Sequence, residues 1–548
     1  MDSVDQTVTV MDVVTGKAIQ TAKVEGAPTR LLRTPDGRRI LVLDRGQGDD
    51  FGNDGFRAKT KSALTILDGR TLAVQGRVEL GTGLDDRLML SSAGDRLAIV
   101  CPGYRSKKPA EVQPRELITI DLANAQVLSR IELTRPSPDF LAAPDGNTIV
   151  VLSPPEKPKN AAPLPAELRL IDPAAGKVIA TIALEGDPRG PVLAPDAQIV
   201  YLLDRGKPND NPDKNQNGKL HAVSLTTREV IEVSDAGSKP RGLVLDEDRK
   251  RLLLLSDGPP VKGPANKNRA GELRIVVNGK PGAPIAVGSE PERIEPSADG
   301  KFLNVLGMQG VTRLALPGLQ PSPVVEAPGM GGDETAISAD GRRGWASYGE
   351  YFTTYDLEKG ARVAQVKTGR LGKKMFLALE TGLKTETSRL EGETKAKKDG
   401  RSYYSYTEYT LKEPKGSMAV RPDGKEIYAL NTQTSDVTVI DADTGQVIEK
   451  VAAGGFAIRF MPSASAALVV SSSTVAVIDF ASHQKLTDLV SGSQAGFNGA
   501  KLSPDARFAV LHGPQGLMFV SVANGKPIGT MVPGRGIADV DIDWREQR

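Results

Sequence analysis

Cysteine, histidine and aromatic residues are scarce in this sequence, and their scarcity excludes several kinds of site. The 548 residues include one cysteine, Cys101, three histidines and only 4% aromatic residues. A single cysteine excludes internal disulfides and any metal or haem site that needs several cysteines. Three histidines leave little material for a histidine-rich metal centre.

Excess charge and long apolar runs are missing as well. The formal net charge is +2, which disfavours a dedicated nucleic-acid binder. No apolar run approaches the roughly 18–20 residues that a membrane helix needs. No signal peptide is visible, because Met1-Asp2-Ser3 leads almost directly into a strand-like segment. If the protein is exported, we expect its signal to have been removed from this sequence.

What the sequence has in abundance is a repeat, rich in glycine and proline. Each unit contains a run such as VTVID, a turn such as TGK, a second run such as VIATI, a loop into a motif such as LSPDA or TPDG, and a closing run such as RILVL. Short runs of Val, Ile and Leu bounded by Gly, Pro, Asp and Asn predict strands, and the Asp-Gly and Thr-Gly pairs predict tight hairpins. The units begin near residues 8, 64, 117, 168, 220, 273, 311, 352, 437, 474 and 517.

Four antiparallel strands in every 40–55 residues or so predict an all-β fold of about eleven propeller blades. A β-sandwich does not repeat in this way, and the coil of a β-solenoid is usually shorter. We expect two rings, with a first region over residues 1–272 and a second over 273–548; the alternative is one oversized ring. The chain begins with third- and fourth-strand pieces and ends with a first-strand piece at Gly536–Trp544, so we expect the termini to share a blade.

The repeat resembles the YVTN-type β-propeller repeat. The best match runs from Arg421-Pro422-Asp423-Gly424 through Tyr428–Asn431 to Val437–Asp441 and Thr444-Gly445. The resemblance covers nearly the whole chain. It is specific for architecture and nearly silent on function, because propellers host many activities. The family includes oxidoreductase subunits and lactonases. Together with the low cysteine content, the resemblance implies an extracytoplasmic protein, periplasmic or at the cell surface.

The connection between the second and third strands is long in the first five units. In a propeller this connection and the fourth-to-first connection open on one face, and long loops without structure of their own are often functional. We therefore predict a binding face; the alternative is tolerated surface insertion. The long connections are Asp44–Ala63, Pro102–Glu116, Ser153–Glu167, Asp204–Lys219 and Ser256–Glu272, and the short ones include Gly307–Gly310, Thr432–Asp436 and Ser471–Ser473.

Residues 383–413 predict a long β-hairpin that projects from the propeller, with its turn at Asp399-Gly400. Tyrosine is enriched at protein interfaces, so the four tyrosines of its second half are candidate contact residues for a partner or another subunit. The alternative is a hairpin that packs its tyrosines on its own propeller or across its own strands. The tyrosines are Tyr403, Tyr404, Tyr406 and Tyr409.

The loop DRGKPNDNPDKNQNGK, residues 204–219, is a candidate calcium site. Asp213-x-Asn215-x-Asn217-Gly218 matches the start of the Asp-x-Asx-x-Asx-Gly calcium loop, and Lys219 would offer its backbone carbonyl. The bidentate Glu that ends that motif is missing, since Ser224 stands in its place. Asp210 or Asp204 would complete the shell. The alternative is a polar turn without metal.

Motifs for catalysis are missing: the sequence has no nucleophile elbow, Walker loop, HExxH or CxxCH. The histidines His221, His483 and His512 are interpreted as structural or exposed. Arg189 and Arg241, in equivalent units, bind an anionic ligand or close salt bridges between blades.

We interpret the chain as a non-enzymatic binding or scaffold propeller that recognises a protein or polymer partner through its long loops. The first alternative is a propeller enzyme of lactonase or dehydrogenase-subunit type with its site in a funnel. The second is a surface-assembly subunit that uses the hairpin.

Overall fold

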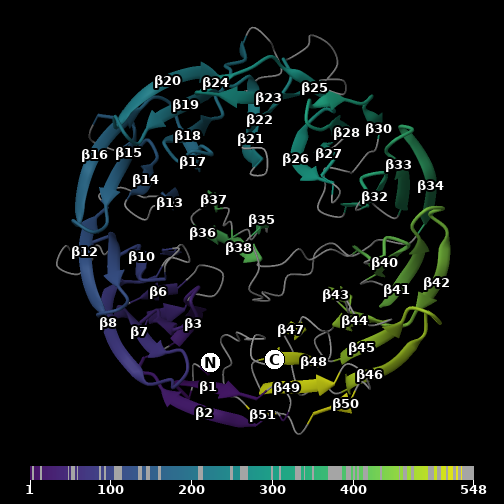
Figure 1. Ribbon diagram of the computed structural model, residues 1–548, viewed down its shortest axis with the longest axis horizontal. Helices are drawn as coiled ribbons and strands as arrows, with labels where there is room; N and C mark the ends of the chain where they lie inside the picture. Colours follow the sequence, from purple (N-terminus) through teal and green to yellow (C-terminus); the bar gives the residue numbers. More distant parts are fainter. Residues whose placement is uncertain are drawn as a thin grey trace. The chain divides into compact units, whose positions relative to one another are not determined.

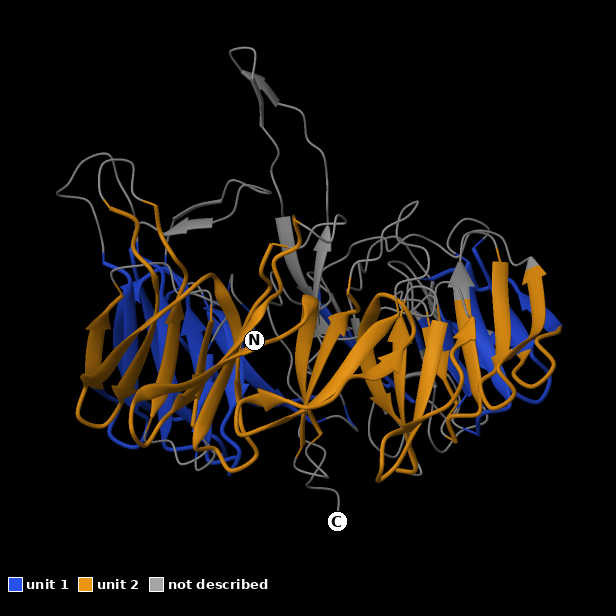
Figure 2. Cartoon of the chain, turned by 90° about the horizontal axis from the view of Figure 1, so that it is seen from above, with its two compact units in different colours: residues 1–127, 370–440, 447–548 blue, residues 128–369, 441–446 orange. Residues whose placement is uncertain are grey.

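A computed structural model represents the chain, and it describes most of residues 1–367 and 418–533 and the strands of the 383–413 segment. The residues that it leaves undescribed include 104–113, 208–213, 260–269, 327–334, 368–385, 412–417 and 534–548, together with shorter gaps. The chain divides into two compact units, coloured in Figure 2. Unit 1 comprises residues 1–127, 370–440 and 447–548, and unit 2 comprises residues 128–369 and 441–446.

In its described residues, unit 2 contains five consecutive antiparallel sheets whose first four strands follow one another in chain order. In two of these sheets a fifth strand, β25 or β30, pairs with the third strand. In Figure 1 the first strands β13, β17, β21 and β26 lie on the inner side of this unit and the fourth strands β16, β20 and β34 on its outer side. The strands are β13 (Asp139–Ala142), β14 (Ile149–Ser153), β15 (Ala166–Asp172) and β16 (Lys177–Leu184); β17 (Pro188–Leu193), β18 (Ile199–Asp204), β19 (Lys219–Ser224) and β20 (Glu229–Asp235); β21 (Ser238–Asp246), β22 (Arg251–Asp257), β23 (Gly271–Val277), β24 (Lys280–Pro281) and β25 (Ile285–Val287); β26 (Pro291–Pro296), β27 (Phe302–Gly307), β28 (Gly310–Ala315), β29 (Gln320–Pro321) and β30 (Val325–Glu326); and β31 (Thr335–Ile337), β32 (Arg343–Tyr348), β33 (Tyr351–Asp356) and β34 (Ala361–Lys367).

Unit 1 follows the same plan, with a two-stranded sheet at the start of the chain. Its strands are β1 (Thr7–Met11) and β2 (Ala18–Lys23); β3 (Pro28–Arg33), β4 (Arg39–Asp44), β7 (Lys61–Asp68) and β8 (Val74–Thr82); β9 (Leu88–Leu90), β10 (Arg96–Cys101), β11 (Glu116–Asp121) and β12 (Gln126–Glu132), which runs on into unit 2; β39 (Met418–Val420), β40 (Glu426–Asn431), β41 (Asp436–Asp441) and β42 (Val447–Val451); β43 (Ala457–Phe460), β44 (Ala466–Val470), β45 (Thr474–Asp479) and β46 (Lys485–Ser491); and β47 (Gly499–Leu502), β48 (Phe508–Gly513), β49 (Gly516–Ser521), β50 (Lys526–Pro527) and β51 (Val532–Pro533).

These sheets confirm the predicted all-β propeller fold built from four-stranded units. The predicted unit starts fall within β1 of the two-stranded sheet and within the third strand of the later sheets, from β7 through β45 and β49. The predicted boundary at residues 272 and 273 falls inside β23 in unit 2, and the division into two propeller regions stays a prediction. The predicted first-strand piece at Gly536–Trp544 lies outside the described residues.

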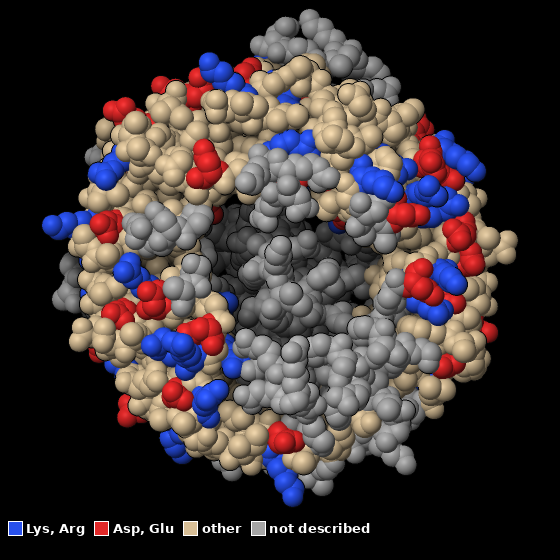
Figure 3. Space-filling model, viewed as in Figure 1, with Lys and Arg blue, Asp and Glu red and all other residues tan. Residues whose placement is uncertain are grey.

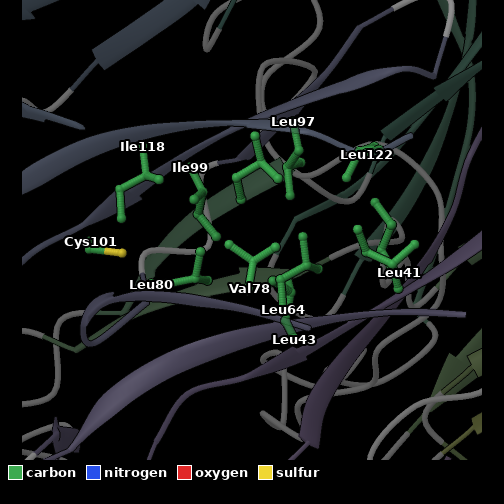
Figure 4. Close-up of a cluster of buried hydrophobic side chains, with 12 residues drawn as sticks. Leu41, Leu43, Leu64, Val78, Leu80, Leu97, Ile99, Cys101, Ile118 and Leu122 are labelled. Atoms are coloured by element: carbon green, nitrogen blue, oxygen red, sulfur yellow. The ribbon is translucent and has the colours of Figure 1, made fainter. Parts of the chain in front are cut away.

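Apolar side chains hold successive sheets together. In unit 2 one cluster joins Leu168 of β15 to Leu202 of β18, and the next joins Leu220 of β19 to Leu254 of β22. In unit 1 the cluster drawn in Figure 4 joins Leu64 of β7 to Ile99 and other residues of β10 and β11. The alternating pattern of the strands thus buries one face against the preceding sheet and the other against the following sheet.

Hydrogen bonds within the turns explain why the repeat keeps its motif. In the turn between the third and fourth strands, Asp441 Oδ1 accepts the backbone N–H of Thr444 at 2.7 Å and its hydroxyl at 2.8 Å. In the first hairpin, Ser338 Oγ donates to Asp340 Oδ1 at 2.6 Å. Such Asx and hydroxyl turns stabilise the backbone locally. Gly445 has a positive φ of 68°, and an added Cβ would lie 2.6 Å from the Ala364 Cβ, so this turn requires glycine.

The segment around 383–413 forms the predicted β-hairpin. Strand β35 (Glu386–Leu390) pairs with β38 (Thr407–Leu411), and β36 (Ala396–Lys398) pairs with β37 (Arg401–Tyr403). Lys398 pairs with Arg401, on either side of the predicted turn, while Asp399 and Gly400 themselves lie outside the described residues. A further two-stranded hairpin, β5 (Gly48–Asp50) with β6 (Phe56–Ala58), lies within the first long connection.

Candidate binding face

Each sheet has one end at which the second strand leads to the third and the fourth leads to the next sheet; we call it the loop end. In the sheet β17–β20 the pairing places Pro188, Asp204, Lys219 and Asp235 in one row across this end. Gly218 N–H donates to the carbonyl of Gly237 at 2.9 Å, which ties the long connection to the passage into β21. The two kinds of connection therefore open at the same end, as predicted.

The five long connections are present where the sequence predicts them. They separate Asp44 from Lys61 and Cys101 from Glu116 in unit 1, and in unit 2 they follow Ser153, Asp204 and Asp257. In later sheets the same connection is short: Gly307 pairs with Gly310, Tyr348 pairs with Tyr351, and Asn431 is followed by a strand at Asp436. The long loops are therefore additions to a sheet that closes without them.

A polar network anchors the described part of the loop 205–218. Asn215 Nδ2 donates to Asn217 Oδ1 at 2.8 Å, and Asn217 Nδ2 donates to both carboxylate oxygens of Asp235 at 3.0 and 3.2 Å. Ser238 Oγ donates to Asn215 Oδ1 at 3.3 Å. Both amide oxygens thus already accept a protein hydrogen bond, and the network joins the loop to the neighbouring sheet.

The carboxylate of Asp235 is the electrostatic centre of this network. Burial alone would raise its pKa, but the hydrogen bonds from Asn217 and from the Gly237 N–H lower the pKa below its ordinary value, helped by the charges of Lys219 and Arg274. Asp235 is therefore ionised at neutral pH and holds the base of the loop.

The predicted calcium residues divide between described and undescribed parts of the chain. Asn215, Asn217 and Lys219 lie at the loop end, whereas Asp210 and Asp213 fall outside the described residues. Asp204 holds the turn, since its Oδ1 accepts the Gly206 N–H at 2.8 Å. In the part of the chain that the structure describes, no group of three His, Cys, Asp or Glu residues could hold a metal ion. Calcium in this loop stays a prediction.

Glycines at the loop bases allow close backbone contact. Gly206 has a φ of 67°, and an added Cβ would lie 2.4 Å from the Gln216 carbonyl oxygen. Gly46, at the equivalent position after Asp44, has a φ of 77° and would meet the Thr60 carbonyl oxygen at 2.7 Å. The shared sequence Leu-Asp-Arg-Gly therefore reflects one loop-closing geometry in two sheets.

The arginines that the sequence singles out in equivalent units form ion pairs. Arg241 binds Asp257 through Nε at 2.8 Å and Nη2 at 3.3 Å, and its Nη1 lies 3.9 Å from Glu292 of the next sheet. Arg189 pairs with Asp187 at 3.0 Å. Arg241 thus forms a salt bridge to the neighbouring sheet, as the salt-bridge alternative predicts. The ion pair of Arg189 is local to its own unit, so a bridge between blades at Arg189 stays a prediction. Figure 3 shows Lys and Arg interspersed with Asp and Glu over the described surface.

The four hairpin tyrosines are placed only in part. Tyr403 lies in β37 opposite Ala396, and Tyr409 lies in β38 opposite Ser388. Tyr404 and Tyr406 fall outside the described residues. Whether the tyrosines form a contact stripe stays a prediction.

Sequence reasoning missed a cluster at the opposite end of the sheets, in unit 1. Glu426 accepts hydrogen bonds from Arg421 Nη1 at 3.0 Å and the Tyr428 hydroxyl at 3.1 Å, and its Oε1 lies 3.0 Å from His483 Nε2. Burial raises the pKa of the Tyr428 hydroxyl. His483 has a φ of 53° and occupies the turn position that Gly445 holds in its own sheet. A histidine in place of this glycine was the sequence signal by which the cluster could have been found. The cluster ties the sheet β39–β42 to β43–β46.

No protein-family model matches the chain, and no curated protein has a significantly similar sequence. Solved structures with a similar fold include hydrazine synthase of Kuenenia stuttgartiensis, at 15% identity and TM-score 0.32, covering 62% of this chain and 95% of that one. They also include the dihydro-heme d1 dehydrogenase NirN in complex with DHE, at 12% identity and TM-score 0.35, covering 98% and 79%. The β-propeller domain of Myceliophteria thermophila Cps50 (Swd1) matches at 13% identity and TM-score 0.30, covering 63% and 98%. Similarities at this level do not extend to function.

In the described residues, no helix is long and apolar enough to cross a membrane.

Proposed function

We propose that this chain is a non-enzymatic binding or scaffold propeller of the YVTN-repeat type that recognises a protein or polymer partner through its loop ends. The observation that carries the proposal is the contrast between connections. Five consecutive sheets carry long second-to-third connections, while later sheets close the same connection as tightly as Tyr348 to Tyr351. Loops that the fold does not need, held on rigid strands, are the usual site of recognition.

The anchoring of the loop 205–218 supports this proposal. The network of Asn215, Asn217, Asp235 and Ser238 fixes the base of the loop on two sheets. A fixed base reduces the entropy lost when a loop binds a partner. We propose an extracytoplasmic location for the protein, and a second contact through the hairpin tyrosines Tyr403 and Tyr409.

Site-specific photo-cross-linking tests this function. A photoreactive residue placed at Lys207, which is exposed at the loop end, is expected to capture a partner in the native host. The matched control is Lys359, exposed in the turn between β33 and β34 at the opposite end of the sheets in unit 2. A third position, Tyr409, reports on the hairpin. Capture from Lys359 with none from Lys207 or Tyr409 would contradict the proposal.

Calcium in the loop 205–218 would stiffen the proposed binding face. With Asp213, Asn215 and Asn217 as ligands, calcium at about 100 times its Kd stabilises the folded state by about 2.7 kcal/mol. We expect calcium to raise the melting temperature of the wild type and to leave that of Asp213→Ala unchanged. Magnesium at the same concentration serves as the control, because it prefers a smaller octahedral shell. An equal calcium response in both proteins would refute this assignment.

A further inference from the structure

Charge is divided unevenly between the five long connections and the rest of the chain. The connections contain 15 Lys and Arg and 7 Asp and Glu, whereas the other residues of the chain contain 55 and 61. The connections therefore carry a net charge of +8 and the remainder a net charge of −6. Counted between the second and third strands, the connections are residues 45–60, 102–115, 154–165, 205–218 and 258–270.

Three of these connections belong to consecutive sheets of unit 2: residues 154–165, 205–218 and 258–270. Together they contain 8 Lys and Arg, 3 Asp and Glu, and no aromatic residue. The short connections of the five later sheets contain neither lysine nor arginine in the sequence. The added loops thus differ from the short ones in charge as well as in length.

The described parts of two of these loops are held by backbone pairing. In the loop 205–218, Lys207 and Gln216 exchange hydrogen bonds of 3.1 and 3.0 Å, in register with the pairing of β18 and β19. In the loop 154–165, Glu156 and Leu164 exchange hydrogen bonds of 3.0 and 2.8 Å, in register with β14 and β15. Both loops therefore extend their hairpins beyond the sheet and carry their side chains on an ordered base.

Most described acidic side chains at the loop end of the sheet β17–β20 have donors of their own. These donors are the Arg189 guanidinium for Asp187, the Gly206 N–H for Asp204, and the Asn217 amide for Asp235. Glu185, exposed in the passage into β17, has no such donor among the described residues. Little negative charge at this end is left to neutralise the basic side chains.

The basic side chains of these two extensions are exposed and form no ion pair within the described residues. They are Lys157, Arg205, Lys207, Lys214 and Lys219. The acidic residues Asp210 and Asp213 of the same loop lie outside the described residues, and with them the loop 205–218 still has more basic than acidic residues. A long side chain that pairs with nothing in its own protein can pair with a ligand without breaking an existing contact.

We propose that the loop end of unit 2 binds a short acidic segment of a protein partner, whose carboxylates pair with Lys157, Arg205, Lys207 and Lys214. The inference rests on the proposed recognition function and names the class of partner. Complementary charge steers such a segment to the loops and favours it over neutral or basic competitors.

A short acidic protein segment fits this end better than a nucleic acid or a long anionic polysaccharide. The three loops offer no aromatic ring on which a base could stack. A long polyanion would also extend past the loops over a chain whose remainder carries −6, and charges repel one another within a Debye length of about 8 Å at physiological salt. A short segment makes the favourable contacts alone.

Fluorescence anisotropy of a labelled poly-L-glutamate peptide, titrated with the full chain, tests the proposal. Replacing Lys157, Lys207 and Lys214 together by Gln is expected to raise the Kd about tenfold, because each exposed ion pair contributes modestly. The matched control replaces three lysines at the opposite end of the sheets of unit 2 by Gln and is expected to keep the Kd of the wild type. These control lysines are Lys177, Lys280 and Lys359.

An equal Kd for the wild type and the loop variant would overturn the proposal, as would an equal rise in both variants. Thermal unfolding shows whether the loop variant folds. If it does not, the wild type alone decides. Its affinity for poly-L-glutamate is expected to fall as salt rises and to exceed its affinity for duplex DNA of the same total charge. Constant affinity over the salt series, or tighter binding of the DNA, would contradict the proposal.

The partner peptide cross-linked to a photoreactive residue in place of Lys207 separates this inference from the proposed function. Mass spectrometry of the cross-link is expected to identify a peptide with a net negative charge. A neutral or basic peptide would overturn the acidic class of partner and leave recognition by the loops standing. Capture from Lys359 alone would instead contradict the proposed function itself.

Discussion

Trp345→Ala is expected to lower the free energy of unfolding by about 3–5 kcal/mol, the usual cost of truncating a buried large aromatic residue. Trp345 lies on β32, is fully buried, and donates its Nε1–H to the Ala442 carbonyl at 3.0 Å. Ala442 belongs to the turn after β41, so the indole fills space and also ties this turn to the sheet β31–β34. Urea unfolding followed by circular dichroism measures the loss.

Two further variants separate packing from hydrogen bonding at Trp345. Trp345→Phe keeps most of the apolar volume but leaves the buried Ala442 carbonyl without its donor, which costs about 1–3 kcal/mol. Val363→Ala, at a residue of β34 that is 42% exposed, is the surface control and should change stability by less than about 1 kcal/mol. A Trp345→Ala protein as stable as the Val363→Ala protein would contradict the role given to the indole.

Gly206→Ala is expected to destabilise the chain by about 2–5 kcal/mol and to displace the base of the loop 205–218. Its φ of 67° costs an alanine about 1–2 kcal/mol. The added Cβ would also lie 2.4 Å from the Gln216 carbonyl oxygen and 2.6 Å from that of Asn217, so backbone must move, at a further cost of about 1–3 kcal/mol.

Gly190→Ala is the matched control for this substitution. Gly190 has a φ of 57°, and an added Cβ there meets no atom within 4 Å. This variant therefore carries the backbone strain without the contact. Thermal unfolding of both proteins isolates the effect of the loop contact. If the two variants lose the same stability, Gly206 does not close the loop in the way described.

Much of the fold could be predicted from the sequence because its signals are local and repeated. The Asp of each VTVID run accepts hydrogen bonds within the next turn, as Asp441 does, so the motif marks the end of a third strand wherever it occurs. Asp-Gly turns, such as Asp340-Gly341 with φ of 67° at the glycine, mark the first hairpins in the same way. Repetition made the third strands and the loop end predictable from these turns alone.

The site could be predicted only in part, because its contacts join residues far apart in the chain. The sequence motif suggested ligands at Asn215 and Asn217, but their partners Asp235 and Ser238 come from β20 and the start of β21. Such contacts carry no local pattern, and no repeat signal marks them.

The central claim is that the long loops serve recognition and that the sheets fold without them. The most direct measurement replaces residues 205–218 by Gly-Glu, the pair between Tyr348 and Tyr351, and quantifies the partner cross-linked from the loop end. For this purpose the photoreactive residue stands at Lys157, which is exposed in the long connection that follows Ser153 in the same unit. We predict a cooperatively folded protein whose capture of the partner falls at least tenfold. Unchanged capture by a folded protein would contradict the claim.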